Sequence, residues 1–150
     1  MPSSRTGEGS LTANAVKIRV IYADTDAMGI AYHTNYIRWF EIGRTELLRE
    51  MGIVYRELES EGFYLPLTEL HCHYLKPARY DDVIRIEARI NYFRRASIKF
   101  DYEIWDEKRE SCLVEGSTIH AFLNREGKIV RPPRAIADKI NTILSSQPKS

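Results

Sequence analysis

The stretch that decides the fold is residues 35–51, NYIRWFEIGRTELLREM. At about 100° per residue, its apolar side chains gather on one side of a helix. This stripe comprises Tyr36, Phe40, Gly43, Leu47 and Met51, flanked by Trp39, Ile37 and Leu48. The apolar arc covers about half the circumference, which is more than a helix on a surface carries. Gly43 lies inside it, although glycine costs about 1 kcal/mol against alanine in a helix. We therefore expect another backbone close to Gly43 and a broad, curved sheet around the helix.

The ends of the helices are marked by capping residues. Thr34 is expected to cap the long helix at its start, and Gly52 follows its end. A shorter helix is expected over about residues 54–60. Two prolines at 132–133 are expected to begin a C-terminal helix that reaches about Leu144.

The remaining segments have the composition and two-residue alternation of strands. They are residues 16–21, 63–74, 84–92, 97–104 and 112–123. Pro66 favours an edge or a bulge in the second of them, and the last is apolar on both faces, as in a central strand. The order of strand, long helix and four strands in an antiparallel meander predicts an α+β fold with one helix against one sheet.

Composition limits the class of protein. The 150 residues suffice for one core, and 43% hydrophobic with 29% charged residues is typical of soluble globular proteins. A net charge of +1 gives no global field that would attract nucleic acid or a membrane. Apolar runs fall short of the roughly 20 residues that a membrane span needs. We expect a cytoplasmic protein without nucleic-acid partners or membrane insertion.

The domain limits follow from composition as well. Residues 1–14, rich in Ser, Gly and Thr, are expected to form a flexible leader, residues 15–146 a single domain and residues 147–150 a tail. Cys72 and Cys112 have no CxxC spacing, and we interpret them as reduced, buried thiols.

The segment after the first expected strand carries a recognisable motif. Residues 22–36 read YADTDAMGIAYHTNY, followed by Trp-Phe-Glu at 39–41 and by Arg44. This closely resembles the signature of 4-hydroxybenzoyl-CoA thioesterase-like proteins and looks closest to the bacterial Tol-Pal-associated acyl-CoA thioesterase branch. The resemblance extends from about Val16 to Leu144. It implies a hotdog fold, in which a curved antiparallel sheet holds a long helix, and subunits that pair into homodimers with a continuous sheet and often into homotetramers.

Thioester hydrolysis needs a nucleophile or base beside the carbonyl carbon and hydrogen-bond donors where charge develops on the oxygen. By the resemblance, Asp26 is the catalytic carboxylate. It acts either as a nucleophile that forms a mixed anhydride or as a general base on water. The backbone N–H of His33, at the helix start, is expected to polarise the carbonyl. The His33 side chain either lines the pocket or helps to protonate the departing thiolate. Alternatively, Asp26 only accepts backbone hydrogen bonds in its loop.

The resemblance also implies residues that bind the substrate. They are Gly29, Tyr32, Tyr36, Arg94, Arg95 and Ser97. The last three form a turn between two strands, where the family has a basic nucleotide-binding stretch. Forked guanidinium groups suit phosphate oxygens, although the turn could also be only a solvated basic surface.

Other polar residues have simpler interpretations. Asp24 is expected to order its loop, because no third metal ligand follows it, and His71 and His73 lack a zinc-ligand set. Glu41 is the rival catalytic carboxylate, which we interpret as a structural ion pair with Arg44. We expect neither a metal nor another cofactor.

The sequence therefore predicts an acyl-CoA thioesterase that releases coenzyme A and a free acid from short-chain, medium-chain or aryl substrates. Tyr32, Tyr36, Trp39 and Tyr64 are candidates to line the acyl pocket. Two alternatives remain open. One is a non-catalytic acyl-CoA-binding or scaffold protein, and the other is a hydratase or dehydratase, which uses a different pattern of histidine and carboxylate.

Overall fold

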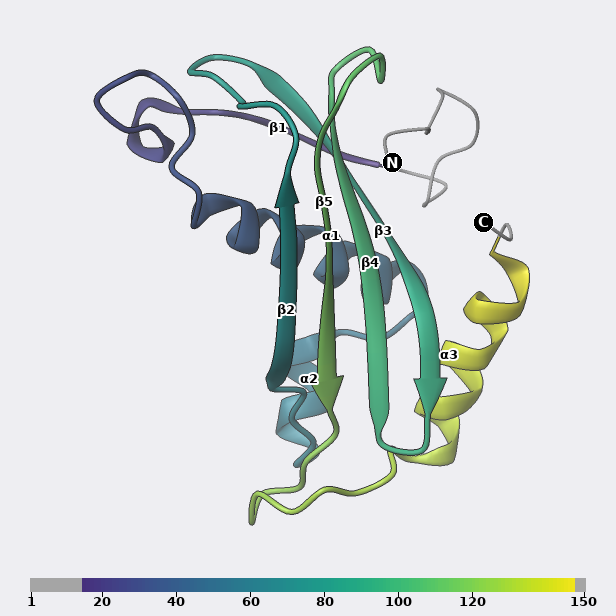
Figure 1. Ribbon diagram of the computed structural model, residues 1–150. Helices are drawn as coiled ribbons and strands as arrows, with labels where there is room; N and C mark the ends of the chain where they lie inside the picture. The colour runs from purple at the N-terminus through teal and green to yellow at the C-terminus, as the bar shows by residue number, and fades with distance from the viewer. Residues whose placement is uncertain (1–14, 148–150) are drawn as a thin grey trace.

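The computed structural model describes residues 15–147, in which one curved antiparallel sheet wraps around one long helix (Figure 1). The elements in chain order are β1 (Val16–Arg19), the 3-10 turn η2 (Tyr22–Asp24), α1 (Asn35–Glu50), α2 (Tyr55–Ser60), β2 (Leu67–Tyr74), β3 (Val83–Arg94), β4 (Ser97–Asp106), β5 (Cys112–Ala121) and α3 (Arg134–Ser146). The predicted leader at 1–14 and residues 148–150 of the predicted tail lie outside the described residues. The predicted α+β hotdog arrangement is confirmed.

The strand order in the sheet is β1-β3-β4-β5-β2, and every neighbouring pair is antiparallel. Only β3, β4 and β5 form a meander, so the predicted meander of four strands is wrong for β2. Tyr64 pairs with Leu123 just before β2 begins, which brings this strand to the far side of β5. As a result β2 is an edge strand, on the left of the sheet in Figure 1, with one row of backbone groups open.

The predicted apolar stripe of α1 faces the inner side of the sheet. Tyr36, Phe40, Leu47 and Met51 are each at most 8% exposed. A Cβ on Gly43 would lie 2.8 Å from Cγ2 of Ile86 on β3. We had expected a backbone close to Gly43, and this prediction is wrong. The close approach is to a side chain, because the buried isoleucines of β3 fill the space beneath the helix.

The predicted helix ends are partly confirmed. Gly52, with φ of +81°, closes α1 in the left-handed conformation that glycine adopts at low cost. Thr34 occupies the position before α1, but its side chain makes no capping hydrogen bond. The capping role predicted for Thr34 is therefore wrong.

The second half of β3 has a further neighbour in Gln147. The Gln147 side chain accepts a hydrogen bond from the Ile90 N–H (2.8 Å) and donates one to the Ile90 carbonyl (2.8 Å). Gln147, which we had expected to be the first residue of the tail, thus packs on the part of β3 that does not pair with β1.

No helix within the described residues is long and apolar enough to cross a membrane.

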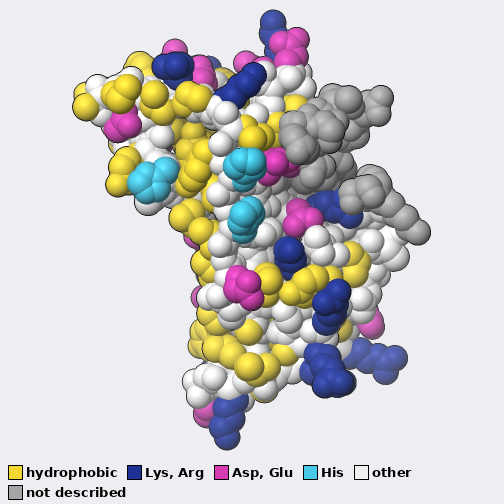
Figure 2. Space-filling view, viewed as in Figure 1, with side chains coloured by type: hydrophobic (Ala, Val, Ile, Leu, Met, Phe, Trp, Pro, Cys, Tyr) yellow, Lys and Arg dark blue, Asp and Glu magenta, His cyan; other side chains and the backbone are white. Residues whose placement is uncertain are grey.

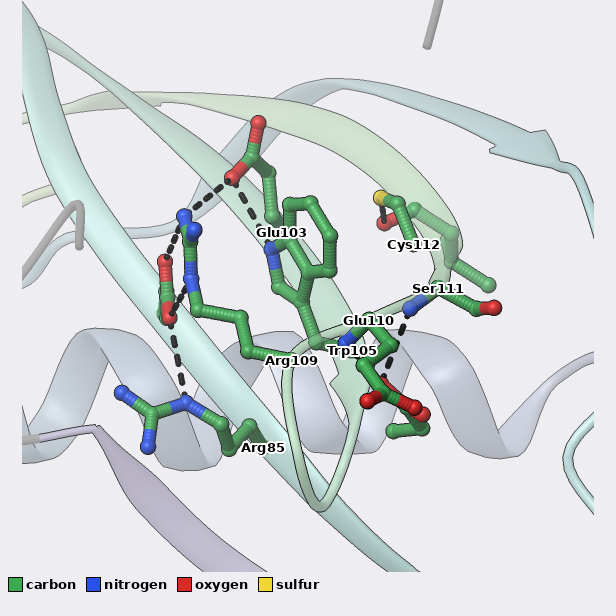
Figure 3. A network of polar contacts seen from close by, with 10 residues as sticks. Arg85, Glu103, Trp105, Arg109, Glu110, Ser111 and Cys112 are labelled. Carbon is green, nitrogen blue, oxygen red and sulfur yellow. Dashed lines mark hydrogen bonds and ion pairs between the residues drawn. The ribbon is translucent and has the colours of Figure 1, made fainter. Parts of the chain in front are cut away.

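On the outer face of the sheet, two buried carboxylates share one arginine (Figure 3). Arg109 donates to both oxygens of Glu87 (2.7 and 3.1 Å) and lies 3.7 Å from Glu103. Its guanidinium also stacks on Trp105 at 4.2 Å, and the Trp105 indole donates to Glu103 (3.0 Å). Glu87 and Glu103, which the alternation places on the polar side, are at most 1% exposed because Arg109 and Arg85, whose Nε lies 3.3 Å from Glu87, compensate their charge.

Beneath α1, a chain of polar groups crosses the core. Arg44 donates to the Tyr102 hydroxyl (3.1 Å), which lies 2.6 Å from the Thr118 hydroxyl. His120 contacts Thr118 through Nε2 (2.9 Å) and the Leu65 carbonyl through Nδ1 (3.0 Å). No ion pair joins Glu41 to Arg44 in the described part of the chain, so the predicted pairing is wrong.

The direction of this chain follows from its last acceptor. Because the Leu65 carbonyl can only accept, His120 carries its proton on Nδ1, and Nε2 must accept from Thr118. Thr118 in turn accepts from Tyr102. A protonated His120 would donate from both nitrogens and would reverse these bonds. Burial, and then the charge of Arg44, lower the pKa of His120 to about 4.

We expect this histidine to make stability depend on pH. The unfolded chain takes up a proton on His120 near pH 6.5, whereas the folded chain does so only near pH 4. As the pH is lowered from about 6.5 to about 4, the free energy of unfolding should therefore decrease by roughly 3 kcal/mol in total. Urea denaturation at several pH values measures this slope. His120→Gln should flatten it, and an unchanged slope in that variant would contradict the assignment.

Candidate active site

Asp24 ties the loop before α1 to the start of that helix. Its carboxylate accepts a hydrogen bond from the Ile21 N–H (3.0 Å) and pairs with Arg38 at 2.6 Å. Its backbone carbonyl accepts from the Tyr32 N–H (2.8 Å) and from the Asn35 side chain (2.7 Å). Asp24 itself is 5% exposed. The predicted role of Asp24 in ordering the loop is confirmed by these contacts.

Asp26 uses one carboxylate oxygen to hold its own loop. Oδ1 accepts hydrogen bonds from the N–H groups of Met28 (2.8 Å) and Ile30 (3.3 Å). The backbone closes the same turn, since the Asp26 N–H donates to the Ile30 carbonyl (2.9 Å). Asp26 is exposed, and within residues 15–147 its Oδ2 accepts no hydrogen bond. The carboxylate is thus fixed through one oxygen and open for chemistry at the other.

The start of α1 offers two successive backbone donors. The N–H groups of His33 and Thr34 have no acceptor in the part of the chain that the structure describes. The carbonyl of Tyr32 accepts from the Asn35 N–H (2.9 Å), and the carbonyl of His33 accepts from the Tyr36 N–H (3.3 Å). A helix start with unpaired N–H groups carries partial positive charge and suits a developing oxyanion.

A pocket of about 300 Å³ opens at this helix start. It is lined by Ile30, Ala31, His33, Tyr36, Tyr74, Leu75, Lys76 and Pro77. Most of these side chains are apolar or aromatic, which is typical of sites for organic ligands. Figure 2 shows hydrophobic side chains gathered over the loop at the upper left and along the margin beneath it, on the side of the molecule where β2 lies.

Tyrosines form the polar wall of the pocket. The Tyr36 hydroxyl accepts a hydrogen bond from the Ala78 N–H (3.0 Å), and no group among residues 15–147 accepts its proton. The ring of Tyr36 packs edge-on against Trp39 (5.0 Å) and Tyr74 (5.3 Å). Burial raises the pKa of Tyr36 and raises the pKa of Tyr74 to about 12, so both hydroxyls remain protonated donors at neutral pH.

The predicted site residues of the signature lie around this pocket. His33 and Tyr36 line it, whereas Asp26 does not line it but accepts a hydrogen bond from the N–H of Ile30, which is a lining residue. The ring of Tyr32 lies 4.4 Å from that of His33. Gly29 is at the tip of the loop with φ of +75°, where a residue with a side chain would be strained.

The predicted phosphate-binding turn lies elsewhere. Ser97 at this turn pairs through β4 with Ala121, whereas Tyr74 at the pocket pairs with Val114. Val114 and Ala121 are about 23 Å apart along β5, at about 3.3 Å per residue of strand. Within one chain, the structure does not bring the turn and the pocket together.

The geometry of the turn leaves its arginines on the surface. The Arg94 guanidinium stacks on the ring of Tyr92 at 4.2 Å. Arg95 is exposed and has φ of +52°, a left-handed conformation that directs the chain back into β4. Both guanidinium groups are thus accessible to an anion.

Part of the pocket wall lies outside the signature and was not predicted as such. Tyr74, Leu75 and Pro77 come from the end of β2 and the loop after it, far from the signature in the chain. The signal that could have found them is the apolar-aromatic run that ends a predicted strand at a proline. Its position beside α1 depends on β2 pairing with β5, which the sequence analysis did not predict.

The remaining candidates lie on or near the β2 edge. His71 and His73 are exposed, with Nδ1 of His73 at 3.9 Å from Glu115. Cys72 and Cys112 form no disulfide within residues 15–147 and are half-buried, less buried than we had expected. Burial raises the pKa of the Cys72 thiol.

Related proteins point to the same chemistry. A putative esterase from Aquifex aeolicus is 33% identical over 120 residues, which cover 80% of this chain and 91% of that protein. A putative acyl-CoA thioesterase of Bacillus subtilis, YneP, is 31% identical over 110 residues, with coverages of 73% and 79%. The acyl-CoA thioester hydrolase YbgC of Escherichia coli O6:H1 is 36% identical over 87 residues, 58% of this chain and 65% of that protein. YbgC represents the Tol-Pal-associated branch, so the predicted resemblance is confirmed.

A solved structure agrees with the sequence relatives. A probable thioesterase from Bartonella henselae superposes with a TM-score of 0.74 at 32% identity, over 80% of this chain and 98% of that chain. Residues 20–140 match the family described as the thioesterase-like superfamily. The fold, the open carboxylate beside a helix start and these relatives together lead to one assignment: the chain belongs to the thioesterase-like superfamily and is a thioester hydrolase with the hotdog fold.

Proposed function

We propose that this protein hydrolyses acyl-CoA thioesters to a free acid and coenzyme A at the pocket beside the start of α1. The observation that carries the proposal is the pair of unengaged N–H groups, of His33 and Thr34, at a pocket of about 300 Å³. The Asp26 carboxylate accepts a hydrogen bond from the N–H of Ile30, and Ile30 lines this pocket. A donor pair and an open carboxylate are the two parts that acyl transfer from a thioester requires.

In the proposed reaction the thioester oxygen accepts hydrogen bonds from the His33 N–H and its neighbour. Oδ2 of Asp26 then either attacks the carbonyl carbon or takes a proton from a water that attacks it. Direct attack breaks the carbon–sulfur bond, releases the coenzyme A thiolate and leaves a mixed anhydride, which water hydrolyses to the acid. The Tyr36 hydroxyl, which keeps its proton, donates a hydrogen bond to the bound substrate.

The acyl group rests on the apolar and aromatic wall. Ala31, Leu75 and the ring of Tyr74 offer contacts to short or medium aliphatic chains as well as to aryl groups. Gly29, at the tip of the loop, and Tyr32, beside His33, complete the substrate-binding set. No metal or other cofactor takes part in this mechanism.

We assign coenzyme A phosphate binding to Arg94, Arg95 and Ser97. Because this turn lies about 23 Å along the sheet from the pocket of its own chain, it would serve the pocket of a partner subunit. Antiparallel pairing of two β2 edges would place the turn of one subunit toward the pocket end of the other. The proposed enzyme is therefore a homodimer, or a homotetramer of two such dimers, and we place it in the cytoplasm.

The free edge of β2 supports pairing with a second copy. All residues of β2 except Cys72 are exposed, and Leu67 and Leu70 are 48% and 39% exposed. An edge strand with open backbone groups and exposed leucines pairs readily with another strand.

We expect Leu70→Lys to convert the dimer into a monomer, because it places two like charges across the paired edges. Light scattering after size-exclusion chromatography measures the mass. Lys99→Leu, on the inner strand β4, is the control and should remain dimeric. A wild-type protein that is monomeric at micromolar concentration would contradict this interface.

The function itself is tested with a panel of acetyl-, butyryl-, hexanoyl-, palmitoyl- and benzoyl-CoA. Free thiol is detected with a chromogenic disulfide, and the free acid by mass spectrometry. Equal amounts of thiol and acid are the expected result. Binding without thiol release would instead indicate a scaffold or acyl-CoA-binding protein. Hydration of an enoyl-CoA at the β-carbon without thiol release would indicate a hydratase.

A further inference from the structure

We propose that Tyr74 is a positioning residue of the thioester site. Its hydroxyl holds the His33 carbonyl and thereby fixes the peptide unit that carries the Thr34 N–H. This inference rests on the proposed function, because it concerns the donors that would face the thioester oxygen. It adds a side chain from β2 to a set of proposed donors and a carboxylate that all come from the segment before α1.

The contact joins two elements that are distant in the chain. The Tyr74 hydroxyl donates to the His33 carbonyl at 3.1 Å, across a sequence separation of 41 residues. The ring of Tyr74 is oriented by its edge-on contacts with Tyr36 (5.3 Å) and His33 (6.5 Å). Tyr74 also lines the pocket, so its hydroxyl is at the wall of the site itself.

The helix start needs this support because its own cap is missing. The side chain of Thr34, at the capping position, makes no hydrogen bond to the first turn. A capping side chain normally fixes the first turn of a helix and contributes about 1 kcal/mol. Here the first turn is held from outside, by Asp24 through the Tyr32 N–H and by Tyr74 through the His33 carbonyl.

The hydrogen bond also strengthens a donor. The His33 carbonyl and the Thr34 N–H belong to one peptide unit, and a peptide whose carbonyl accepts a hydrogen bond becomes a better donor at its N–H. The His33 carbonyl accepts from both Tyr74 and the Tyr36 N–H. The Tyr74 hydroxyl is protonated at neutral pH, as a tyrosine ordinarily is, and burial, followed by the neighbouring Cys72, raises its pKa further, to about 12. It therefore acts as a constant donor and not as a base.

The test is Tyr74→Phe, which removes the hydroxyl and keeps the ring that packs on Tyr36. We expect kcat to fall about fivefold, which corresponds to about 1 kcal/mol for one hydrogen bond, because each 1.4 kcal/mol changes a rate tenfold. KM, and the dissociation constant of an unreactive thioether of coenzyme A, should change less than about twofold. Tyr80→Phe is the matched control, because the Tyr80 hydroxyl makes no hydrogen bond among residues 15–147 and the variant should keep the wild-type kcat.

Each result has a distinct meaning. An unchanged kcat in Tyr74→Phe, or a tenfold rise in KM at constant kcat, would overturn the positioning role. An inactive wild-type protein would overturn the proposed function, and the Tyr74 contact is then decided by NMR. The His33 carbonyl carbon should shift upfield in Tyr74→Phe and not in Tyr80→Phe, because the hydrogen bond that deshields it is lost. The same shift in both variants, or in neither, would overturn the inference.

Discussion

Replacing Asp26 by asparagine is expected to lower kcat at least 100-fold while the fold stays intact. Asparagine keeps an oxygen that can accept from the N–H groups of Met28 and Ile30, so the loop should retain its shape. It loses the charge and basicity of Oδ2, which the proposed attack or water activation requires. Losses of about 10² to 10⁴ are usual when an acid–base group or nucleophile is removed.

The measurement is kcat from free-thiol release, with circular dichroism and the melting temperature as checks on the fold. Glu41→Gln is the matched control, because Glu41 is the rival carboxylate and is exposed on α1. It should keep kcat within about twofold of the wild type. A nearly normal kcat in Asp26→Asn together with a large loss in Glu41→Gln would move the chemistry to the helix.

The second large effect concerns the fold that carries the site. Gly116→Ala should destabilise the protein by about 3 kcal/mol, at the upper end of what overpacking costs. A Cβ at this position on β5 would lie 2.5 Å from Cε2 of Phe40 and 2.7 Å from the carbonyl oxygen of His71 on β2. The Phe40 ring is itself stacked on Tyr102 at 4.5 Å, and the His71 carbonyl belongs to the sheet backbone, so neither neighbour can move freely.

Urea denaturation measures this loss as a shift of the midpoint at constant slope. Ser117→Ala, at the next and half-buried position of β5, is the control and should stay within about 0.5 kcal/mol of the wild type. A loss below about 1 kcal/mol in Gly116→Ala would mean that α1 packs less tightly on the sheet than described. Because Phe40 lies on the helix that directly follows the proposed donors, the variant should also lower kcat.

The sequence predicted those parts of the fold that depend on local pattern. The stripe on α1 was predicted because burial of one helix face imposes a period of 3.6 residues. β3 and β4 were predicted because burial of one face imposes a two-residue alternation on their sequences. The place of β2 was not, since alternation reports which face is buried and says nothing about the neighbouring strand. Contacts across the chain, such as Arg44 with Tyr102 instead of Glu41, were missed for the same reason.

The candidate site was predicted where it lies in one contiguous motif. Asp24 and His33 fall within the signature, and local turns bring them to the helix start. Tyr74 was missed because only the pairing of β2 with β5 carries it there. Glu87 was expected on the polar face because a charged residue is normally solvated, and its burial depends on Arg109 in the β4–β5 hairpin. Long-range compensation of this kind leaves no periodic trace in a sequence.

The most direct test of the central claim compares thiol release by the wild type and by Asp26→Asn at saturating acyl-CoA, with thioether binding measured in both. We predict rapid release of coenzyme A by the wild type on at least one substrate of the panel, a rate at least 100-fold lower in Asp26→Asn, and equal binding of the thioether. Equal rates in the two proteins, or no thiol release from any thioester that the wild type binds, would contradict the account.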